Sequence, residues 1–258
     1  MKRLFLILFL LIGTARLAAQ TVDDLNFVTE NYAPLNFEEE GKVRGIAVDA
    51  LVAIFELVGA PKTVADIELW PWARGYQAVL NKKNTVLFSM ARTEAREKLF
   101  KWVGPCAPSE VVIVAKKIRK IKIESPRDIG QFKTGVVRDD IGEQLLLQLG
   151  VKETALHQTN SGLSTAKMLA RDRVDMWAYE KDVASWNLRE AGADPSTYEV
   201  VYSLKKSNYF YAFHKETDDQ VIATLQKALD KLKADGTLEK IAARYTHTAA
   251  PAEKGTAH

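Results

Sequence analysis

Residues 85–105 read TVLFSMARTEAREKLFKWVGP, an apolar strand pattern followed by a helix that Thr93 can cap. Arg96 then falls in the first turn of that helix, where a cation opposes the helix dipole and costs about 0.3 kcal/mol or more. A nearby anion removes this cost, and a guanidinium can hold both oxygens of a carboxylate. We therefore expect Arg96 to bind a carboxylate. The alternative is a surface ion pair of Arg96 with Glu94 or Glu97.

The N-terminus has the composition of a secretory signal peptide. Lys2 and Arg3 precede an apolar run at residues 4–12, and small residues follow as far as Ala19. The run is shorter than the roughly 20 residues that cross a bilayer. We expect residues 1–19 to be a signal peptide and the rest to be secreted to a periplasm. Since no cysteine lies near the expected cleavage site, a lipid anchor is not expected.

The charge of the chain is balanced once the predicted signal peptide is set aside. The 258 residues include 36 basic and 33 acidic side chains, and residues 1–19 hold three of the basic ones and none of the acidic ones. The remainder is formally neutral, which gives no reason to expect a nucleic acid partner or an anionic membrane surface. Cys106 is the single cysteine. Without an internal disulfide, the stability has to come from a large core.

Strand and helix patterns alternate along the chain, which predicts an α/β fold with mostly parallel sheets. The expected strands are residues 25–29, 63–69, 85–89, 111–115, 133–137, 174–177, 198–204 and 209–214. The expected helices are the one that Thr93 can cap and residues 47–58, 71–80, 125–129, 140–149, 164–171, 181–190, 218–234 and 238–245. No linker rich in glycine or proline separates them, which favours two lobes joined by crossing strands.

Five motifs in this order resemble the family 3 bacterial extracellular solute-binding proteins, the periplasmic receptors of polar amino-acid ABC transporters. They are NYAP at 31–34, GKVRGIAVD at 41–49, SMARTEAR at 89–96, VDMWAYE at 174–180 and LKADGTLEKI at 232–241. The resemblance implies a two-lobed periplasmic-binding-protein type II fold, in which each lobe is a mostly parallel sheet flanked by helices and two hinge strands cross between the lobes. Its expected parts are lobe 1 (20–111 and 205–246), lobe 2 (112–204) and a disordered tail (247–258).

The resemblance also assigns ligand-binding residues in the first lobe. Arg96 maps onto the arginine that holds the α-carboxylate of the ligand, and Ser89 onto a serine at the end of the preceding strand. Tyr32 maps onto the tyrosine that stacks on the ligand side chain, with Glu30 and Asn31 beside it. For Tyr32, ordinary loop packing is the alternative.

In the second lobe, the resemblance places Glu180 where an acidic residue binds the ammonium group of the ligand. Arg96 and Glu180 would then hold a zwitterion from opposite lobes, so that binding closes the cleft. The alternative for Glu180 is an acid that is stabilised at a helix start by the dipole.

Three positions depart from the pattern of the family. Ala91 stands where relatives often have a hydroxyl, and residues 138–142 read RDDIG where a glycine and hydroxyl turn is usual. Arg138 is a candidate second anion contact, or else it pairs with its acidic neighbours. The stretch WPWAR at 70–74 offers Trp72 and Arg74 for a ring or a cation in the ligand, although tryptophans are more often core.

We expect no catalytic residue, metal ion or cofactor, because no nucleophile–base pair, metal-ligand spacing or phosphate loop is present in the sequence. The resemblance implies a monomeric receptor for an amino acid or related carboxylate that delivers it to the membrane subunits of an ABC transporter. Two alternatives stay open. Cyclohexadienyl dehydratases, which act on prephenate or arogenate, share the fold and use a glutamate at the position of Glu180 as an acid. The second alternative is a receptor whose partner is a separate sensor protein.

Overall fold

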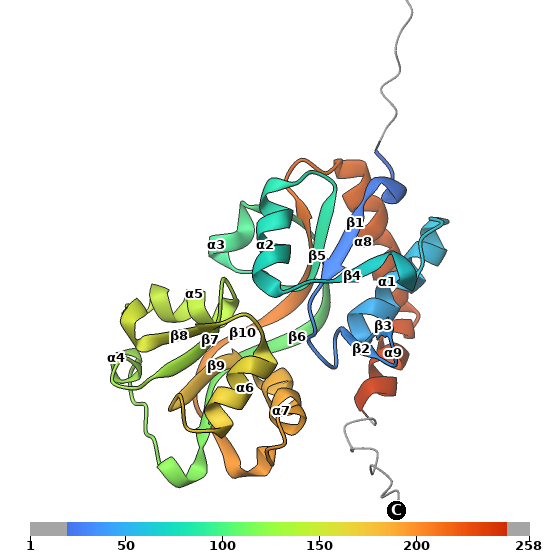
Figure 1. Ribbon diagram of the computed structural model, residues 1–258. Helices are drawn as coiled ribbons and strands as arrows, with labels where there is room; N and C mark the ends of the chain where they lie inside the picture. The colour runs from blue at the N-terminus through green and yellow to red at the C-terminus, as the bar shows by residue number, and fades with distance from the viewer. Residues whose placement is uncertain (1–19, 247–258) are drawn as a thin grey trace, which may run out of the picture.

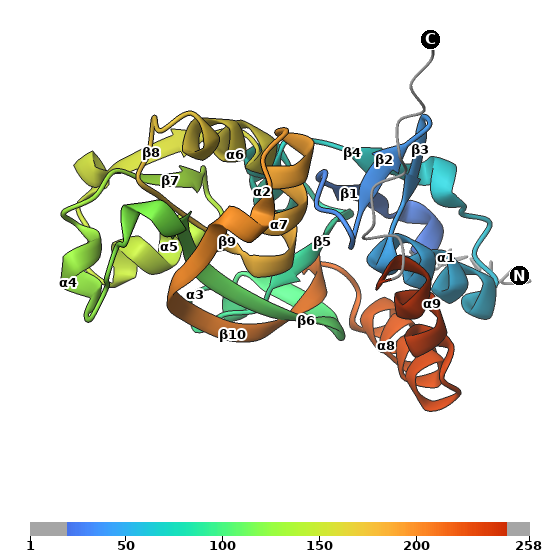
Figure 2. The ribbon, with the colours of Figure 1, turned by 90° about the horizontal axis from the view of Figure 1, so that it is seen from below.

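The computed structural model describes residues 20–246 (Figures 1 and 2). The predicted signal peptide and the predicted tail lie outside the described residues. The chain forms an α/β fold around one eight-stranded sheet with the strand order β4-β1-β5-β10-β6-β9-β7-β8. Figure 1 shows two groups of helices and strands, one at each end of the long strands β6 and β10. We call them lobe 1 and lobe 2.

Lobe 1 is built on three parallel strands: β1 (Asn26–Thr29) pairs with β4 (Ile67–Leu69) and with β5 (Thr85–Ala91). Its helices come from both ends of the chain and are α1 (Ile46–Val58), α2 (Trp72–Asn81), α3 (Glu94–Glu97), α8 (Asp219–Ala234) and α9 (Thr237–Thr246). A separate hairpin, β2 (Phe37–Glu39) and β3 (Lys42–Arg44), and two short 3-10 turns, Val22–Asp24 and Val64–Asp66, complete it.

Lobe 2 repeats the parallel arrangement: β7 (Thr134–Val137) pairs with β8 (Leu156–Thr159) and with β9 (Met176–Glu180). Its helices are α4 (Pro126–Ile129), α5 (Ile141–Gln148), α6 (Gly162–Ala170) and α7 (Lys181–Glu190). Short 3-10 turns lie at Lys117–Arg119, Glu153–Ala155 and Pro195–Thr197. A small core cluster that includes Ile113, Val136 and Leu146 lies in this lobe.

The strands β6 (Phe100–Lys116) and β10 (Tyr198–His214) connect the lobes, and each has 17 residues. They pair antiparallel along their length, while β10 also pairs with β5 and β6 also pairs with β9. The expectation of two crossing strands is therefore confirmed. The expected boundaries at residues 111 and 204 stay a prediction, since both fall inside these strands.

Most of the expected elements are present, with several differences. The predicted strand at 63–69 is a 3-10 turn at Val64–Asp66 followed by the short strand β4, and the predicted strand at 111–115 is part of the longer β6. The predicted strands at 198–204 and 209–214 are a single strand, because register shifts in β10 keep the two parts paired with β6. The hairpin β2–β3 and the edge strand β8 were not predicted from the sequence. At the end of α1, Gly59 has φ 71° and its N–H donates to the carbonyl of Glu56, as the glycine predicts. Within residues 20–246, no helix has the length and apolar character to cross a membrane.

Candidate functional site

Arg96 is positioned by the turn between β5 and α3. All seven residues of β5 are buried, and Thr93 then caps α3 by accepting a hydrogen bond from the Arg96 N–H at 3.3 Å. The cap at Thr93 is confirmed. Because α3 is one turn long, its dipole is weak, and the dipole argument for an anion near Arg96 loses most of its force. The contacts of the side chain itself are more informative.

The Arg96 guanidinium is 1 % exposed and joins the two lobes. It donates to the carbonyl oxygen of Ala91 at 3.3 Å in lobe 1. In lobe 2, it donates to the Asp139 carbonyl oxygen at 3.2 Å and to Gln144 Oε1 at 3.1 Å. The alternative of a surface ion pair with Glu97 is wrong, because Arg92 makes that pair, with its Nε at 2.7 Å from Glu97 Oε2.

Three N–H donors converge on the carbonyl oxygen of Asp139. Besides Arg96, the indole Nε1 of Trp72 and the amide Nε2 of Gln144 donate to this oxygen, each at 3.0 Å. The rings of Trp72 and Tyr76 flank the guanidinium, with centres 5.6 and 5.1 Å from its carbon. Burial lowers the pKa of Arg96 from its ordinary value, and the charge of Asp140 acts against this shift.

Tyr32 lies in an aromatic cluster with Tyr179 of β9 and Tyr209 of β10. Its hydroxyl is 2.8 Å from that of Tyr209, and its ring centre is 5.4 Å from that of Tyr179 in an edge-on arrangement. All three rings are buried. The pKa of Tyr32 is raised well above its ordinary value, mainly by burial and also by the nearby charges of Asp140 and Glu180. Tyr32 of lobe 1 therefore contacts one ring of lobe 2 and one ring of the connecting strand β10.

Ser89 and the Glu30 backbone are linked through a buried asparagine. The Ser89 hydroxyl donates to Asn36 Oδ1, and Asn36 Nδ2 donates to the Glu30 carbonyl oxygen at 2.6 Å. Ser89 lies within β5 and has φ 59°, a left-handed conformation that is uncommon for serine. The Glu30 carboxylate is buried, and burial together with the charge of Asp140 raises its pKa well above the ordinary value.

Glu180 ends β9 and caps α7. Its Oε2 accepts hydrogen bonds from the N–H groups of Asp182 and Val183 at 2.9 and 2.8 Å. The predicted alternative, an acid at a helix start, therefore describes its contacts, while its role toward a ligand stays a prediction. Burial raises the pKa of Glu180 to about 7, against the lowering effect of these N–H groups. The side chain lines a pocket of about 380 Å³ together with Tyr209.

The remaining predicted residues are not all gathered in this cluster. Trp72 is buried and bonded to lobe 2, but Arg74 is exposed and lies over the ring of Trp70, 3.9 Å from its centre. Arg138 is exposed. Asn31 is exposed as well, and its Oδ1 accepts a hydrogen bond from the Glu38 N–H at 3.2 Å. The ligand-binding roles of Arg74, Arg138 and Asn31 stay predictions without a contact to Arg96 or Glu180.

Sequence reasoning missed several residues of the cluster: Asn36, Tyr76, Gln144, Tyr179 and Tyr209. The sequence showed that the turn at residues 138–142 departs from the family pattern, but it did not explain the two aspartates there, Asp139 and Asp140. Tyr179 directly precedes Glu180 on a strand, so the motif at 174–180 could have pointed to it. Gln144 and Tyr209 carried no signal in the sequence, because their roles depend on how the lobes meet.

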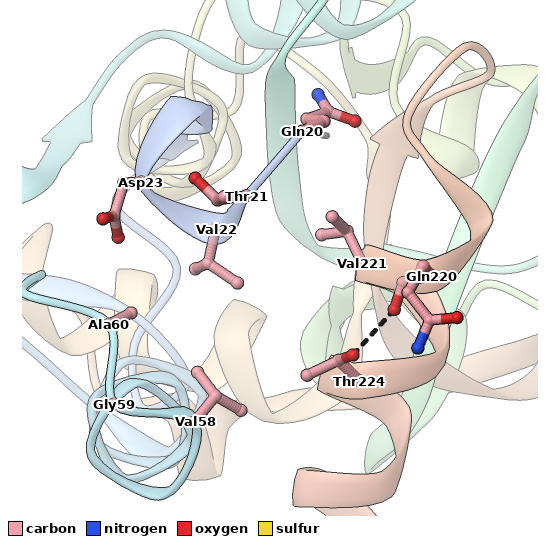
Figure 3. Close-up of a pocket in the computed structure, with 10 residues that line it drawn as sticks. All are labelled: Gln20, Thr21, Val22, Asp23, Val58, Gly59, Ala60, Gln220, Val221 and Thr224. Carbon is pink, nitrogen blue, oxygen red and sulfur yellow. Dashed lines mark hydrogen bonds between the residues drawn. The ribbon is translucent and has the colours of Figure 1, made fainter. Parts of the chain in front are cut away.

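One pocket of lobe 1 has none of these side chains in its lining. Figure 3 shows a pocket of about 260 Å³ between the first described residues, the end of α1 and the start of α8. Inside α8, Thr224 Oγ1 donates to the Gln220 carbonyl oxygen at 2.7 Å, the dashed line in that figure. The residues that line this pocket include one charged side chain, Asp23. Across residues 20–246, no three His, Cys, Asp or Glu side chains are grouped to hold a metal ion.

The fold is that of a two-lobed solute-binding protein, and the comparisons with known proteins agree. Residues 25–248 match the family described as "Bacterial extracellular solute-binding proteins, family 3", and the chain belongs to this family. The structure neighbours are type II periplasmic binding proteins, which confirms the predicted fold class.

Two relatives and one solved structure illustrate the likeness. The chain is 24% identical over 220 residues to the "Probable amino-acid-binding protein YxeM" of Bacillus subtilis, covering 82% of this chain and 79% of that protein. It is 22% identical to the "L-cystine-binding protein TcyA" of the same organism, covering 95% and 97%. The fold is similar to that of a histidine kinase sensor domain, with a TM-score of 0.73, 20% identity and coverage of 88% and 96%.

Proposed function

We propose that this protein is a periplasmic receptor that captures a small carboxylate-bearing solute, an amino acid, between its two lobes and delivers it to an ABC transporter. The observation that carries the proposal is the convergence of Trp72, Arg96 and Gln144 on one oxygen at the contact between the lobes. The named relatives that bind amino acids or cystine support the solute class.

The Asp139 carbonyl marks a position where an acceptor oxygen receives N–H donors from both lobes. A carboxylate oxygen is a stronger acceptor than a carbonyl, particularly toward a guanidinium. A solute carboxylate that replaces the Asp139 carbonyl as acceptor would receive the donors of Arg96 and Trp72 from lobe 1 and of Gln144 from lobe 2. Because the donors come from both lobes, the binding energy would favour the arrangement in which the lobes meet.

Glu180 is the proposed partner of the solute ammonium. Its Oε2 is occupied by two N–H groups of α7, and the side chain also lines the pocket beside Tyr209. An ammonium placed there would hold the buried carboxylate ionised at neutral pH, although its pKa without a solute is raised to about 7, mainly by burial. Ser89 and Glu30 are linked to Asn36 and would shape the lobe 1 wall behind the solute.

A thermal-shift screen of amino acids and small carboxylates tests the proposal. A solute present at about 100 times its dissociation constant adds about 2.7 kcal/mol to the free energy of unfolding and raises the midpoint by several degrees. We expect at least one α-amino acid to do so. A screen in which no amino acid shifts the midpoint would contradict the proposal.

A second candidate function is favoured by one observation, the pKa of Glu180 at about 7, which would suit a general acid. It is a cyclohexadienyl dehydratase on the same fold. The assay is the formation of phenylpyruvate from prephenate or of phenylalanine from arogenate. Solute binding without turnover of either substrate supports the receptor.

The partner of the receptor is the remaining question. The resemblance in fold to a histidine kinase sensor domain shows that this fold alone does not separate transport from sensing. The proposed transporter partner is tested by co-purification of the solute-loaded protein with candidate membrane subunits. Uptake of the labelled solute that does not depend on this protein would favour a sensor.

A further inference from the structure

The carbonyl oxygen of Asp139 accepts more hydrogen bonds than a backbone carbonyl usually does. A carbonyl oxygen has two lone pairs. This one receives N–H donors from Trp72 and Gln144, each at 3.0 Å, and from Arg96 at 3.2 Å. Trp72 and Arg96 belong to lobe 1, whereas the carbonyl belongs to lobe 2. An acceptor of the protein itself therefore already engages the side chains that are proposed to hold the solute carboxylate.

The turn that carries this carbonyl is held in an uncommon conformation. Asp139 has φ 60°, which is left-handed and unfavourable for most residues that carry a side chain. On either side of it, the Arg138 N–H donates to the Thr159 carbonyl oxygen at 3.0 Å, and the Asp140 N–H donates to the Val137 carbonyl oxygen at 3.1 Å. In the described part of the chain, the hydrogen bonds of Asp139 involve its backbone and not its carboxylate. What the turn presents to lobe 1 is thus its backbone carbonyl.

Glu143 holds this turn from inside lobe 2. Its Oε2 accepts the Asp139 N–H at 2.6 Å, and its Oε1 accepts from the side-chain amide of Gln158 on β8. Glu143 is 4 % exposed and lies in the first turn of α5. Burying a carboxylate is unfavourable unless it is hydrogen-bonded, so these two donors fix its place. Since the proposed function gives Glu143 no contact with the solute, its burial is explained by the turn that it holds.

A neutral carbonyl is a weak partner for a buried guanidinium. Arg96 is 1 % exposed and donates to oxygens of Ala91, Asp139 and Gln144, which are all uncharged. Within residues 20–246, it forms no ion pair. A solute carboxylate brings a negative charge and two acceptor oxygens, and its hydrogen bonds to a guanidinium are stronger than those of a carbonyl. It can therefore displace the Asp139 carbonyl, although the displacement breaks an existing contact.

We infer that the turn at residues 138–140 is an internal competitor of the solute: its Asp139 carbonyl oxygen takes the place of the solute carboxylate against Arg96 and Trp72, and Glu143 is the positioning residue that holds it there. The inference rests on the proposed function and adds how the affinity of that site is set. The same donors cannot serve both acceptors, so binding has to break the contact at Asp139. The apparent affinity is then lower than the intrinsic affinity by the fraction of molecules in which this contact is open.

Two substitutions, which we call the release variants, free the donors by different routes. Asp139→Val puts a β-branched residue at the left-handed position, which such residues tolerate poorly, and so displaces the carbonyl. Glu143→Ala removes the acceptor of the Asp139 N–H. The probe is the standard L-amino acid that gives the largest thermal shift with the wild-type protein. By calorimetric titration, each release variant should bind this probe about three- to tenfold more tightly than the wild-type protein, because weakening one hydrogen bond raises the open fraction.

Two further variants separate the competitor from a general structural effect. Asp172→Val is the matched control for backbone strain, because Asp172 is another left-handed aspartate of lobe 2, with φ 54°, and pairs with Lys116 at 2.8 Å away from the interlobe contact. It should lose stability and keep the wild-type affinity for the probe. Glu143→Gln keeps an oxygen that can accept the Asp139 N–H, so it should reverse the gain in affinity that Glu143→Ala shows.

Small-angle X-ray scattering gives a second readout, which does not depend on affinity. Protein that is freed of solute by unfolding and refolding is compared with protein in a mixture of the standard L-amino acids. Because the internal acceptor joins the lobes, the radius of gyration of the wild-type protein should not fall when the mixture is added. Without amino acids, the release variants should have a larger radius of gyration than the wild-type protein, and the mixture should reduce it.

The outcomes separate the inference from the proposed function. Tighter binding of the probe by either release variant, with wild-type affinity in Asp172→Val, supports the inference. Unchanged or weaker binding in both release variants overturns it, and so does a wild-type radius of gyration that falls when amino acids are added. In these two cases the probe still binds, so the receptor function stands. If no standard L-amino acid binds the wild-type protein, the proposed function fails, and the inference that rests on it fails too.

Discussion

The Arg96 guanidinium and the Asp139 carbonyl oxygen lie 3.2 Å apart, and this hydrogen bond joins lobe 1 to lobe 2. Trp72 reaches the same oxygen from α2, so two side chains of lobe 1 hold one backbone group of lobe 2. Asp139 has φ 60°, a left-handed conformation that is uncommon outside glycine and asparagine or aspartate. The turn at residues 138–142 is therefore part of the contact between the lobes.

Replacing Trp72 with Phe tests the indole donor. The substitution keeps an aromatic ring beside Arg96 and removes the N–H that reaches the Asp139 oxygen. We expect solute affinity to fall about three- to tenfold, as for the loss of one hydrogen bond. Trp70→Phe is the control, because the Trp70 indole donates to Glu68 within lobe 1. Equal effects of both substitutions on calorimetric affinity would argue against the role of Trp72.

Glu180 should make the stability of the solute-free protein depend on pH. Its pKa in the folded protein is about 7, raised from an ordinary value of 4.5 mainly by burial. Between these two values, the folded state binds more protons than the unfolded state, so its stability falls as pH rises. Glu180→Gln should flatten this fall. In the wild-type protein, Glu180 should lower the free energy of unfolding by on the order of 3 kcal/mol as pH rises across that range, and denaturant unfolding at several pH values measures this fall.

The pH profile has a direct control. Glu153→Gln removes an exposed acid from the same lobe and should leave the wild-type profile unchanged. The account of Glu180 fails if its glutamine variant keeps the full fall in stability between the two pKa values.

Asn36 should matter for both stability and binding. Asn36→Ala leaves the Ser89 hydroxyl and the Glu30 carbonyl oxygen without their buried partner. Unsatisfied buried groups cost about 1–3 kcal/mol each, so we expect the thermal midpoint to fall by several degrees. Solute affinity should fall too, because the Asn36 side-chain amide holds the backbone at Glu30, two residues before Tyr32. A variant with unchanged stability and affinity would contradict this.

Glu30 should destabilise the solute-free protein at alkaline pH. Its buried carboxyl group has a pKa raised well above the ordinary value, mainly by burial, so its ionisation is unfavourable in the folded state. Glu30→Gln removes this acid and should raise the free energy of unfolding at about pH 8 by about 1 kcal/mol or more. Denaturant unfolding at that pH measures the difference, with Glu153→Gln as the control. A loss of stability in the Glu30→Gln variant would contradict this account.

Much of the fold was predictable because its elements have strong local signals. The periodic apolar residues and Gly59 predicted α1, and α7 was predicted with its observed bounds Lys181–Glu190. The strand β8 was missed because only Leu156 of its four residues is buried. The middle of β10, near Lys205, is polar and partly exposed, so the sequence does not show that the strand continues there.

The site was predictable only where a motif carried it. Six residues were predicted from the sequence to bind a ligand and are buried in the structure, while their contact with a ligand stays a prediction: Arg96, Ser89, Tyr32, Glu30, Glu180 and Trp72. Gln144, Asn36 and Tyr209 come from segments far apart in the chain, and their contacts exist only once the lobes meet or the loop folds back. The pairing of Arg92 rather than Arg96 with Glu97 likewise depends on which side chain faces lobe 2.

Calorimetric titration of Arg96→Ala and Arg92→Ala with the amino acid found in the screen tests the central claim most directly. Both substitutions remove one arginine from the same segment, but Arg96 is buried between the lobes and Arg92 forms an exposed ion pair. We predict that Arg96→Ala abolishes binding, a loss of about 3 kcal/mol or more, and that Arg92→Ala binds like the wild-type protein. Wild-type affinity in a folded Arg96→Ala variant would contradict the claim that this guanidinium holds the solute.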